Sequence, residues 1–303
     1  MPTPSTPTIV AAFDIGSNSI KMTVASVSTT GGIDELYSAS KTVRLGEGID
    51  RTGSLAPDRI EAAVETLNDM SGRARASGAT RLIGVATEAV RIADNGAAFL
   101  ERVLREAGIS TVTISGDAEA SLAYTGLLGE YDLTGTIVMA DIGGASTELV
   151  FGFGENVRWA KSFPIGSGRL TDSFITSDPP TVEELERCQN EAANTLADAP
   201  FADHSGAHLM ITGGTGEYLG RLVSNIDQMN EDEISRALQL TTTLTADELA
   251  QRVEIPPIRA RVLPAGIAIV AAIVARLQPT AISGARSGLR TGLLLQAAKE
   301  SAS

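Results

Sequence analysis

Two turns that combine an acid with glycine are the residues of this sequence best suited to chemistry. In each, an apolar run ends in an aspartate that small residues follow: Asp14 precedes Gly16-Ser17-Asn18-Ser19, and Asp141 precedes Gly143-Gly144-Ala145-Ser146. Glycine lets successive backbone N–H groups approach an anion without obstruction by a Cβ atom, and the hydroxyl groups add donors. An aspartate beside such a turn repels a phosphate unless a divalent cation lies between them, which is how Mg²⁺ binds. The pattern therefore predicts a site for phosphate together with Mg²⁺ (or Mn²⁺).

The two turns are copies of one pattern, 127 positions apart. Asp-Ile-Gly-x-x-Ser occurs at both places, and each copy lies between two apolar segments. A single Asp-x-Gly is more often a turn-stabilising residue than a ligand, but its repetition favours the ligand. We therefore expect an α/β protein of two similar domains, at 1–128 and 135–303, whose turns face each other across an interdomain cleft. The last helix is the element that could pack back on the first domain.

The elements that position the turns are predicted from hydrophobic periodicity and from glycine and proline punctuation. In the first half we expect strands at 8–14, 20–27, 35–45, 81–86 and 111–114, with helices at 57–76, 97–107 and 118–128. In the second half we expect strands at 136–141, 147–153, 157–163, 207–211 and 280–283, with helices at 181–196, after Gly216, at 264–277 and at 289–298. In both halves three strands precede alternating helices and strands.

A third glycine-rich turn, Thr212-Gly213-Gly214-Thr215-Gly216, follows an expected strand. Its N–H groups could also face an anion, above all those of Gly213 and Gly214. The turn lacks the lysine of a Walker A loop and the Gly-x-Gly-x-x-Gly spacing, which argues against a P-loop or dinucleotide fold. His204 and His208 have no cysteine nearby and predict a metal site only weakly. The single cysteine, Cys188, is expected to be an inert thiol.

Composition restricts the partners. The 303 residues include 37 acidic and 24 basic ones, a net charge of −13 that repels nucleic acid and anionic membranes. Hydrophobic residues make up 43% and charged residues 20%, as in ordinary globular proteins. We find no apolar run of the roughly 18 residues that cross a bilayer and no basic, apolar secretory signal. We therefore expect a cytoplasmic protein.

Several ordered motifs resemble those of the exopolyphosphatase/guanosine pentaphosphate phosphohydrolase (Ppx/GppA) family. The resemblance covers nearly the whole chain. The three main motifs are Asp14-Ile15-Gly16-Ser17-Asn18-Ser19-Ile20-Lys21, Ile114-Ser115-Gly116-Asp117-Ala118-Glu119-Ala120 and Asp141-Ile142-Gly143-Gly144-Ala145-Ser146-Thr147-Glu148. The others are Arg44-Leu45-Gly46-Glu47-Gly48, Thr87-x-Ala89-x-Arg91-x-Ala93-x-Asn95, Gly166-x-x-Arg169-Leu170-Thr171 and Gly288-Leu289-Arg290-x-Gly292.

The resemblance implies two actin-like (ribonuclease H-like) domains of the actin/hexokinase/Hsp70 superfamily, and hydrolysis of a terminal phosphate from linear polyphosphate. Glu119 matches the family's catalytic glutamate, which orients or deprotonates the attacking water. Glu148 matches a second acid beside the water or the metal, and Asp14 and Asp141 are the other metal-facing acids. The implied phosphate-binding residues are Gly16, Ser17, Asn18, Ser19, Lys21, Arg91, Gly143, Gly144, Ser146, Thr147, Gly213 and Gly214.

Three positions depart from the family pattern: Ala145 replaces a glycine, Ser121 an arginine, and Thr291 a glutamate. These departures concern substrate fit, and the length of the chain predicts a preference for short polyphosphates. A guanosine pentaphosphate 5′-phosphohydrolase is the alternative, although aromatic residues that could stack on a base make up only 4%. A weakly catalytic polyphosphate or nucleotide sensor and a kinase of the same superfamily also remain open. A homodimer is a further expectation.

Overall fold

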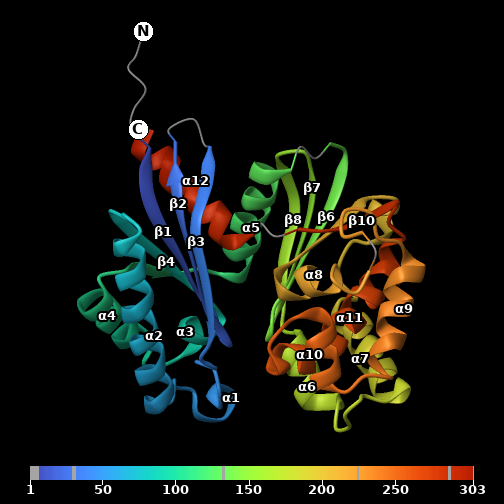
Figure 1. Ribbon diagram of the computed structural model, residues 1–303. Coiled ribbons are helices and arrows are strands. Elements are labelled where there is room, and N and C mark those ends of the chain that lie inside the picture. The colour runs from blue at the N-terminus through green and yellow to red at the C-terminus, as the bar shows by residue number, and fades with distance from the viewer. Residues whose placement is uncertain (1–6, 29–31, 132–133, 224, 286–287, 303) are drawn as a thin grey trace. The chain divides into compact units, whose positions relative to one another are not determined.

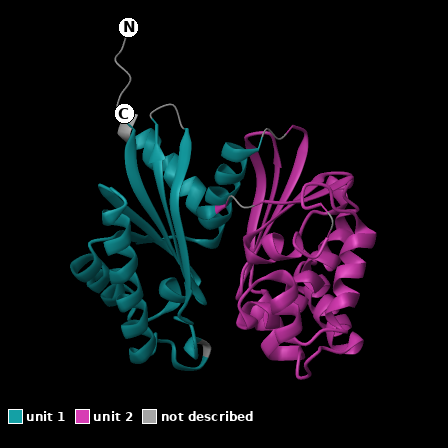
Figure 2. Cartoon of the chain, in the orientation of Figure 1, with its two compact units in different colours: residues 1–131, 289–303 teal, residues 132–288 magenta. Residues whose placement is uncertain are grey.

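The chain forms two compact units, which Figure 2 shows in different colours. The computed structural model describes residues 7–28, 32–131, 134–223, 225–285 and 288–302. Unit 1 comprises residues 1–131 and 289–303, and unit 2 comprises residues 132–288. The predicted domains, 1–128 and 135–303, differ from these units in where the last helix belongs.

Each unit is built on a five-stranded mixed sheet, and the two sheets have the same strand order (Figure 1). In unit 1 the order is β3-β2-β1-β4-β5. Its strands are β1 (Thr8–Ile15), β2 (Ser19–Val27), β3 (Ile33–Thr42), β4 (Arg81–Ala86) and β5 (Ser110–Thr113). In unit 2 the order is β8-β7-β6-β9-β10. Its strands are β6 (Thr136–Ile142), β7 (Thr147–Phe153), β8 (Asn156–Phe163), β9 (His208–Thr212) and β10 (Ala281–Gly284).

The pairing within the two sheets is also the same. In each, the first three strands form an antiparallel meander, and the last two run parallel to the first strand or to each other. The shared order and directions confirm the internal repeat expected from the two Asp-Ile-Gly turns. In both units the turn lies between the first and second strands of the meander.

Unit 1 contains the four helices expected from the sequence, within four residues of their predicted bounds, and two short helices, α1 and α3, that were not expected. They are α1 (Ile49–Thr52), α2 (Pro57–Ala76), α3 (Glu88–Ile92), α4 (Gly96–Ala107), α5 (Gly116–Glu130) and α12 (Leu289–Ala302). Proline at the first position of α2 suits a helix start, since its missing N–H has no partner there in any helix. Gly108 ends α4 in the left-handed conformation that glycine adopts freely.

The last helix packs on unit 1. It contacts α5, β1 and β2. At its start, Arg290 Nη1 donates to Thr23 Oγ1 at 2.6 Å and to the Met22 carbonyl at 3.2 Å. A Cβ atom on Gly292 would overlap the carbonyl oxygen of Leu122 in α5. The absence of a side chain at Gly292 therefore permits the close approach of α12 to α5.

The helices of unit 2 cover a core centred on one long helix. They are α6 (Ser167–Phe174), α7 (Val182–Thr195), α8 (Gly213–Leu219), α9 (Glu231–Thr241), α10 (Ala246–Val253) and α11 (Pro257–Leu277), with a short 3₁₀ turn at Ala202–His204. The helix α11 packs against α6, α7, α9 and α10. Residues 267–270 are 0% exposed, so this helix is apolar because it is surrounded by other elements.

Two predictions about unit 2 were wrong. The helix expected at 264–277 begins at Pro257 and spans 21 residues, with a mean hydropathy of 1.9 in its most apolar stretch. It is thus long and apolar enough to cross a membrane, contrary to our expectation, but 67% of that stretch is buried within the fold. The helix expected after Gly216 begins at Gly213. The reason is that β9 extends to Thr212 and the glycine turn forms the first turn of α8.

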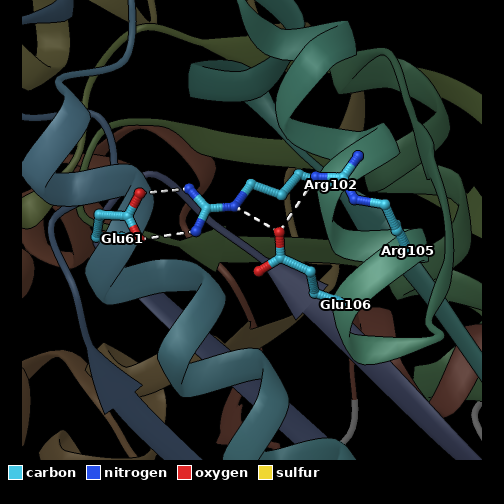
Figure 3. A network of polar contacts seen from close by, with 4 residues as sticks. All are labelled: Glu61, Arg102, Arg105 and Glu106. Atoms are coloured by element: carbon cyan, nitrogen blue, oxygen red, sulfur yellow. Dashed lines mark hydrogen bonds and ion pairs between the residues drawn. The ribbon is translucent and has the colours of Figure 1, made fainter.

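A charged network joins α2 to α4 in unit 1 (Figure 3). The guanidinium group of Arg102 donates to both carboxylate oxygens of Glu61, with Nη2 2.7 Å from Oε2. Arg102 Nε also donates to Glu106 Oε1 at 2.9 Å, and Arg105 approaches the same oxygen at 3.1 Å. Hydrogen bonding to Arg102 lowers the pKa of Glu61 and of Glu106. This solvent-exposed network links two helices of unit 1 and contains none of the expected catalytic residues.

Candidate functional site

The Asp14 turn in unit 1 presents two backbone donors that no other described residue accepts from. The Gly16 N–H donates to the Ser19 carbonyl at 3.1 Å and closes the turn. Within the described part of the chain, the N–H groups of Ser17 and Asn18 make no hydrogen bond. Their carbonyl oxygens, in contrast, accept bonds from the segment at 43–46. The turn therefore directs its acceptors into the protein and leaves donors for an anion.

Lys21 lies opposite Asp14 in the sheet. The two residues are register partners in the β1–β2 pair, and Lys21 Nζ lies 3.9 Å from Asp14 Oδ2. The side chain of Asp14 is 13% exposed and that of Lys21 is 33% exposed. The lysine thus compensates the charge of this aspartate within unit 1, and the role of Asp14 as a metal ligand stays a prediction.

Arg91 contacts the segment between β5 and α5, and Glu119 lies at the start of α5. Arg91, on α3, donates from Nη1 to the Ile114 carbonyl at 2.9 Å. Glu119 lies in the first turn of α5, where the N-cap Ser115 accepts a bond from the Ala118 N–H at 3.1 Å. A carboxylate there interacts favourably with the positive end of the helix dipole. Arg91 therefore supports the backbone just before the helix that carries Glu119.

The Asp141 turn in unit 2 has the same backbone geometry as the Asp14 turn. The Gly143 N–H donates to the Ser146 carbonyl at 3.0 Å. The N–H groups of Gly144 and Ala145 have no hydrogen-bond partner among the residues that the structure describes. Alanine in place of glycine at position 145 therefore adds a methyl group to the turn and leaves the backbone N–H group of this residue free to donate.

The segment after β8 braces this second turn. The Ser167 N–H donates to the Gly143 carbonyl at 2.9 Å, and the Arg169 N–H donates to the Gly144 carbonyl at 3.0 Å. A Cβ atom on Gly166 would lie 2.5 Å from the carbonyl carbon of Gly144. This contact explains the glycine of the Gly166-x-x-Arg169 motif, whose role the sequence alone did not reveal.

Asp141 and Glu148 form a pair of carboxylates on neighbouring strands. They are register partners in the β6–β7 pair, at the positions that Asp14 and Lys21 occupy in unit 1. Glu148 is 3% exposed, and its Oε1 accepts a bond from Ser162 Oγ at 2.6 Å. The repeat therefore carries opposite charges at one position: a lysine offsets the aspartate of unit 1, whereas a glutamate reinforces that of unit 2.

The hydroxyl group of Thr212 is the buried polar atom that needs explanation. Thr212 is the register partner of Asp141 in β9 and is 0% exposed. Of the buried side-chain polar atoms in the described ranges, its Oγ1 is the one with no hydrogen-bond partner. Buried polar groups are nearly always satisfied, by water or an ion if not by protein. Sequence reasoning missed Thr212, because only the β6–β9 register places it beside Asp141.

The oxygen atoms beside Asp141 fit a magnesium ion. Mg²⁺ usually takes one or two carboxylates, with waters and substrate phosphates as its other ligands. Asp141 and Glu148 supply two carboxylates, and the unsatisfied Thr212 hydroxyl can hold a coordinated water. No cluster of three or more acidic, histidine or cysteine side chains that could enclose an ion occurs in the parts of the chain described. The donor set therefore suits an ion that shares its ligands with a phosphate.

Two other predicted residues of unit 2, Thr147 and Gly213, have structural roles. Thr147 is 0% exposed and its Oγ1 donates to the Ile165 carbonyl at 2.6 Å, so its role as a phosphate donor stays a prediction. Gly213 has a φ of 77°, and a Cβ atom on it would lie 2.6 Å from Asp141 Oδ1. This glycine thus leaves room for the carboxylate. Gly214 follows it in the first turn of α8.

Comparison with known proteins places this arrangement in a family. The model of the Ppx/GppA phosphatase family matches residues 23–301. The chain belongs to the Ppx/GppA phosphatase family. It is 28% identical over 304 residues to "Exopolyphosphatase 1" of Mycobacterium tuberculosis, covering 95% of this chain and 87% of that protein. It is 36% identical over 201 residues to "Exopolyphosphatase 2" of the same organism, covering 63% of each.

A solved structure of a Ppx/GppA family member agrees with the fold described above. The crystal structure of the Aquifex aeolicus protein superposes with a TM-score of 0.82 at 29% identity, covering 97% of this chain and 98% of that one. The fold expected from the sequence, an α/β Ppx/GppA protein with two actin-like units, is confirmed. The roles of the individual site residues stay predictions.

Proposed function

We propose that this Ppx/GppA protein is an exopolyphosphatase that uses Mg²⁺ (or Mn²⁺) to hydrolyse the terminal phosphate of linear polyphosphate, with a preference for short chains. The observation that carries the proposal is the Asp141–Glu148 pair beside a turn with free N–H donors. Similarity to two mycobacterial proteins named exopolyphosphatases supports the choice of substrate. Because the net charge of −13 repels a polyanion, its binding requires local donors and a cation.

Each set of residues has a part in this proposal. Asp141 and Glu148 would hold the cation, and the Thr212 hydroxyl group would bind a water beside them. The free N–H groups of both turns bind non-bridging phosphate oxygens. When bound, the cation neutralises charge on the phosphate and stabilises the leaving group. Glu119 accepts a proton from the attacking water, which general-base catalysis by a positioned carboxylate requires.

The role of Glu119 is tested by phosphate release with Mg²⁺. A Glu119→Gln variant keeps the shape of the side chain and removes the base, so kcat should fall by roughly 10²–10⁴-fold. Glu130→Gln, an exposed acid at the other end of the same helix, is the matched control and should retain the wild-type rate. Equal rates for wild type and Glu119→Gln would remove this residue from the mechanism.

The substrate is tested in the same assay with short polyphosphate, long polyphosphate and guanosine pentaphosphate. We expect the highest kcat/KM with short polyphosphate. A preference for guanosine pentaphosphate would favour the alternative phosphohydrolase. Binding without release of phosphate would favour a sensor, and release that requires an acceptor molecule would favour a kinase.

The metal site is tested by thermal unfolding with and without Mg²⁺. An ion that binds only the folded state raises the melting temperature. Asp141→Asn and Glu148→Gln should each abolish this increase, whereas Asp172→Asn, an exposed acid on α6 in the same unit, should preserve it. An undiminished Mg²⁺ effect in both site variants would contradict the assignment. Asp14→Asn in the same experiment tests whether the aspartate of unit 1 contributes.

A further inference from the structure

Arg44 holds an unusual backbone conformation in the loop between β3 and α1. Its φ is 57°, in the left-handed region that side chains disfavour. Two other non-glycine residues among those described share this conformation, Glu254 and Gln278. Both are C-caps, of α10 and α11, where a left-handed residue is the usual way to end a helix. Arg44 ends no helix, so capping does not explain its conformation.

Hydrogen bonds to the phosphate-binding turn hold Arg44 in place. The N–H groups of Val43 and Arg44 both donate to the Asn18 carbonyl, at 2.9 and 2.8 Å. The Gly46 N–H donates to the Ser17 carbonyl at 2.8 Å. The segment thus binds the acceptors of the two residues whose N–H groups are free. Strained residues that the surrounding structure holds in place are concentrated at functional sites.

The guanidinium group of Arg44 is available for a ligand. The residue is exposed, and its side chain forms no hydrogen bond or ion pair within the described ranges. The two cations that were predicted to bind phosphate are engaged: Lys21 lies 3.9 Å from Asp14, and Arg91 donates to the Ile114 carbonyl. Arginine binds phosphate oxygens through two parallel N–H bonds, which a lysine cannot do.

We propose that Arg44 is a substrate-binding residue that, together with the free N–H groups of Ser17 and Asn18, binds a phosphate of the polyphosphate chain. This proposal rests on the proposed function. The contact exists before and during hydrolysis, so it contributes to binding more than to the chemical step. The strain at Arg44 then has a function, because the backbone bonds that maintain it hold this residue next to the turn.

The proposal predicts opposite effects on stability and on binding. Arg44→Gly keeps the backbone N–H bonds, relieves the left-handed strain and removes the guanidinium group. We expect a melting temperature that is unchanged or higher than that of wild type. The KM for tripolyphosphate should rise about tenfold, because one exposed charge-assisted contact is lost, whereas kcat should stay within about twofold of wild type. Arg44→Lys should give an intermediate KM, because it keeps the charge without the two parallel bonds.

Glu254→Gly is the matched control. It relieves the same backbone conformation in unit 2, and the bond that Arg221 donates there reaches the backbone carbonyl, which the substitution retains. Its melting temperature should also stay or rise, and its KM should equal that of wild type. A KM increase in this variant as large as that in Arg44→Gly would mean that backbone relaxation, and not the lost guanidinium group, weakens binding.

A binding measurement separates this proposal from the proposed function. Isothermal titration of tripolyphosphate into Glu119→Gln, with and without Arg44→Gly, measures affinity in the absence of turnover. A dissociation constant about tenfold weaker in the double variant supports the role of Arg44 even if the wild type hydrolyses another phosphate compound. An unchanged dissociation constant, or a KM unchanged in Arg44→Gly, overturns it.

Discussion

The contact between α12 and α5 predicts that Gly292→Ala destabilises unit 1. Alanine in a helix interior is favoured over glycine by about 1 kcal/mol. At Gly292, however, the added Cβ atom would overlap the Leu122 carbonyl oxygen, a backbone atom that cannot rotate away. Forcing two packed helices apart costs about 3 kcal/mol, at the upper end of overpacking effects. The unfolding free energy should therefore fall by about 2 kcal/mol, which lowers the melting temperature by about 6 °C in a unit of this size.

The assay needs a control helix and a probe for each unit. Gly72 lies on α2 of the same unit, and a Cβ atom there would meet nothing within 4 Å, so Gly72→Ala should raise the melting temperature. The single tryptophan, Trp159, lies on β8 of unit 2 and packs edge-on against Phe151 with ring centroids 5.2 Å apart. Circular dichroism follows the whole chain and tryptophan fluorescence follows unit 2. A Gly292→Ala protein that melts within 1 °C of wild type by circular dichroism, while Gly72→Ala is stabilised, would refute the reasoning.

Three further predictions concern buried or half-buried titratable groups of unit 2. Burial alone would raise the pKa of Glu184, but hydrogen bonds from Ser177, Thr181 and Thr176 lower it below its ordinary value. Glu184→Gln should therefore lower the free energy of unfolding, measured in urea, by about 3 kcal/mol. An unchanged urea midpoint would count against a stabilising role for these bonds. Burial lowers the pKa of His208, so the unfolded chain binds a proton at this residue before the folded chain does, and stability falls as the pH drops through about 6.5. His208→Gln should remove part of this loss of stability in urea titrations between pH 8 and pH 5. An identical pH dependence in the variant and the wild type would contradict this prediction. Burial raises the pKa of the Cys188 thiol to about 11, so this thiol should react with a disulfide reagent far more slowly in the folded protein than in the protein unfolded in urea. Equal rates in the two states would contradict its burial.

Elements with strong local signals were predictable from the sequence. The helix α2 was predicted at its observed bounds, because Pro57 marks its start and apolar residues recur along one face. The strands β4 and β7 were also predicted at their observed bounds. The helices α9 and α10 were missed although both carry a readable signal, a capping box formed by Asn230 with Glu233 and by Thr245 with Glu248.

The candidate site was proposed from sequence motifs, whereas the residues that contact its acids could not be predicted. The repeated Asp-Ile-Gly turns identified Asp14 and Asp141, and Glu148 came from the family resemblance. Thr212, in contrast, lies 71 positions after Asp141, in a glycine-rich turn from which only Gly213 and Gly214 were predicted as site residues. Its importance follows from the strand register and from an unsatisfied atom, and neither can be read from the order of residues. The conformation of Arg44 is likewise visible only once the backbone is known.

The placement of α12 has a consequence for how the protein is made. A domain that emerges early from the ribosome can usually fold before the rest of the chain is synthesised. Unit 1 cannot complete its packing in this way, because Arg290 and the rest of α12 belong to it and lie after all of unit 2. During translation unit 2 therefore has all its residues first, and the N-terminal unit must wait, with the faces of α5, β1 and β2 uncovered, until the last helix is released.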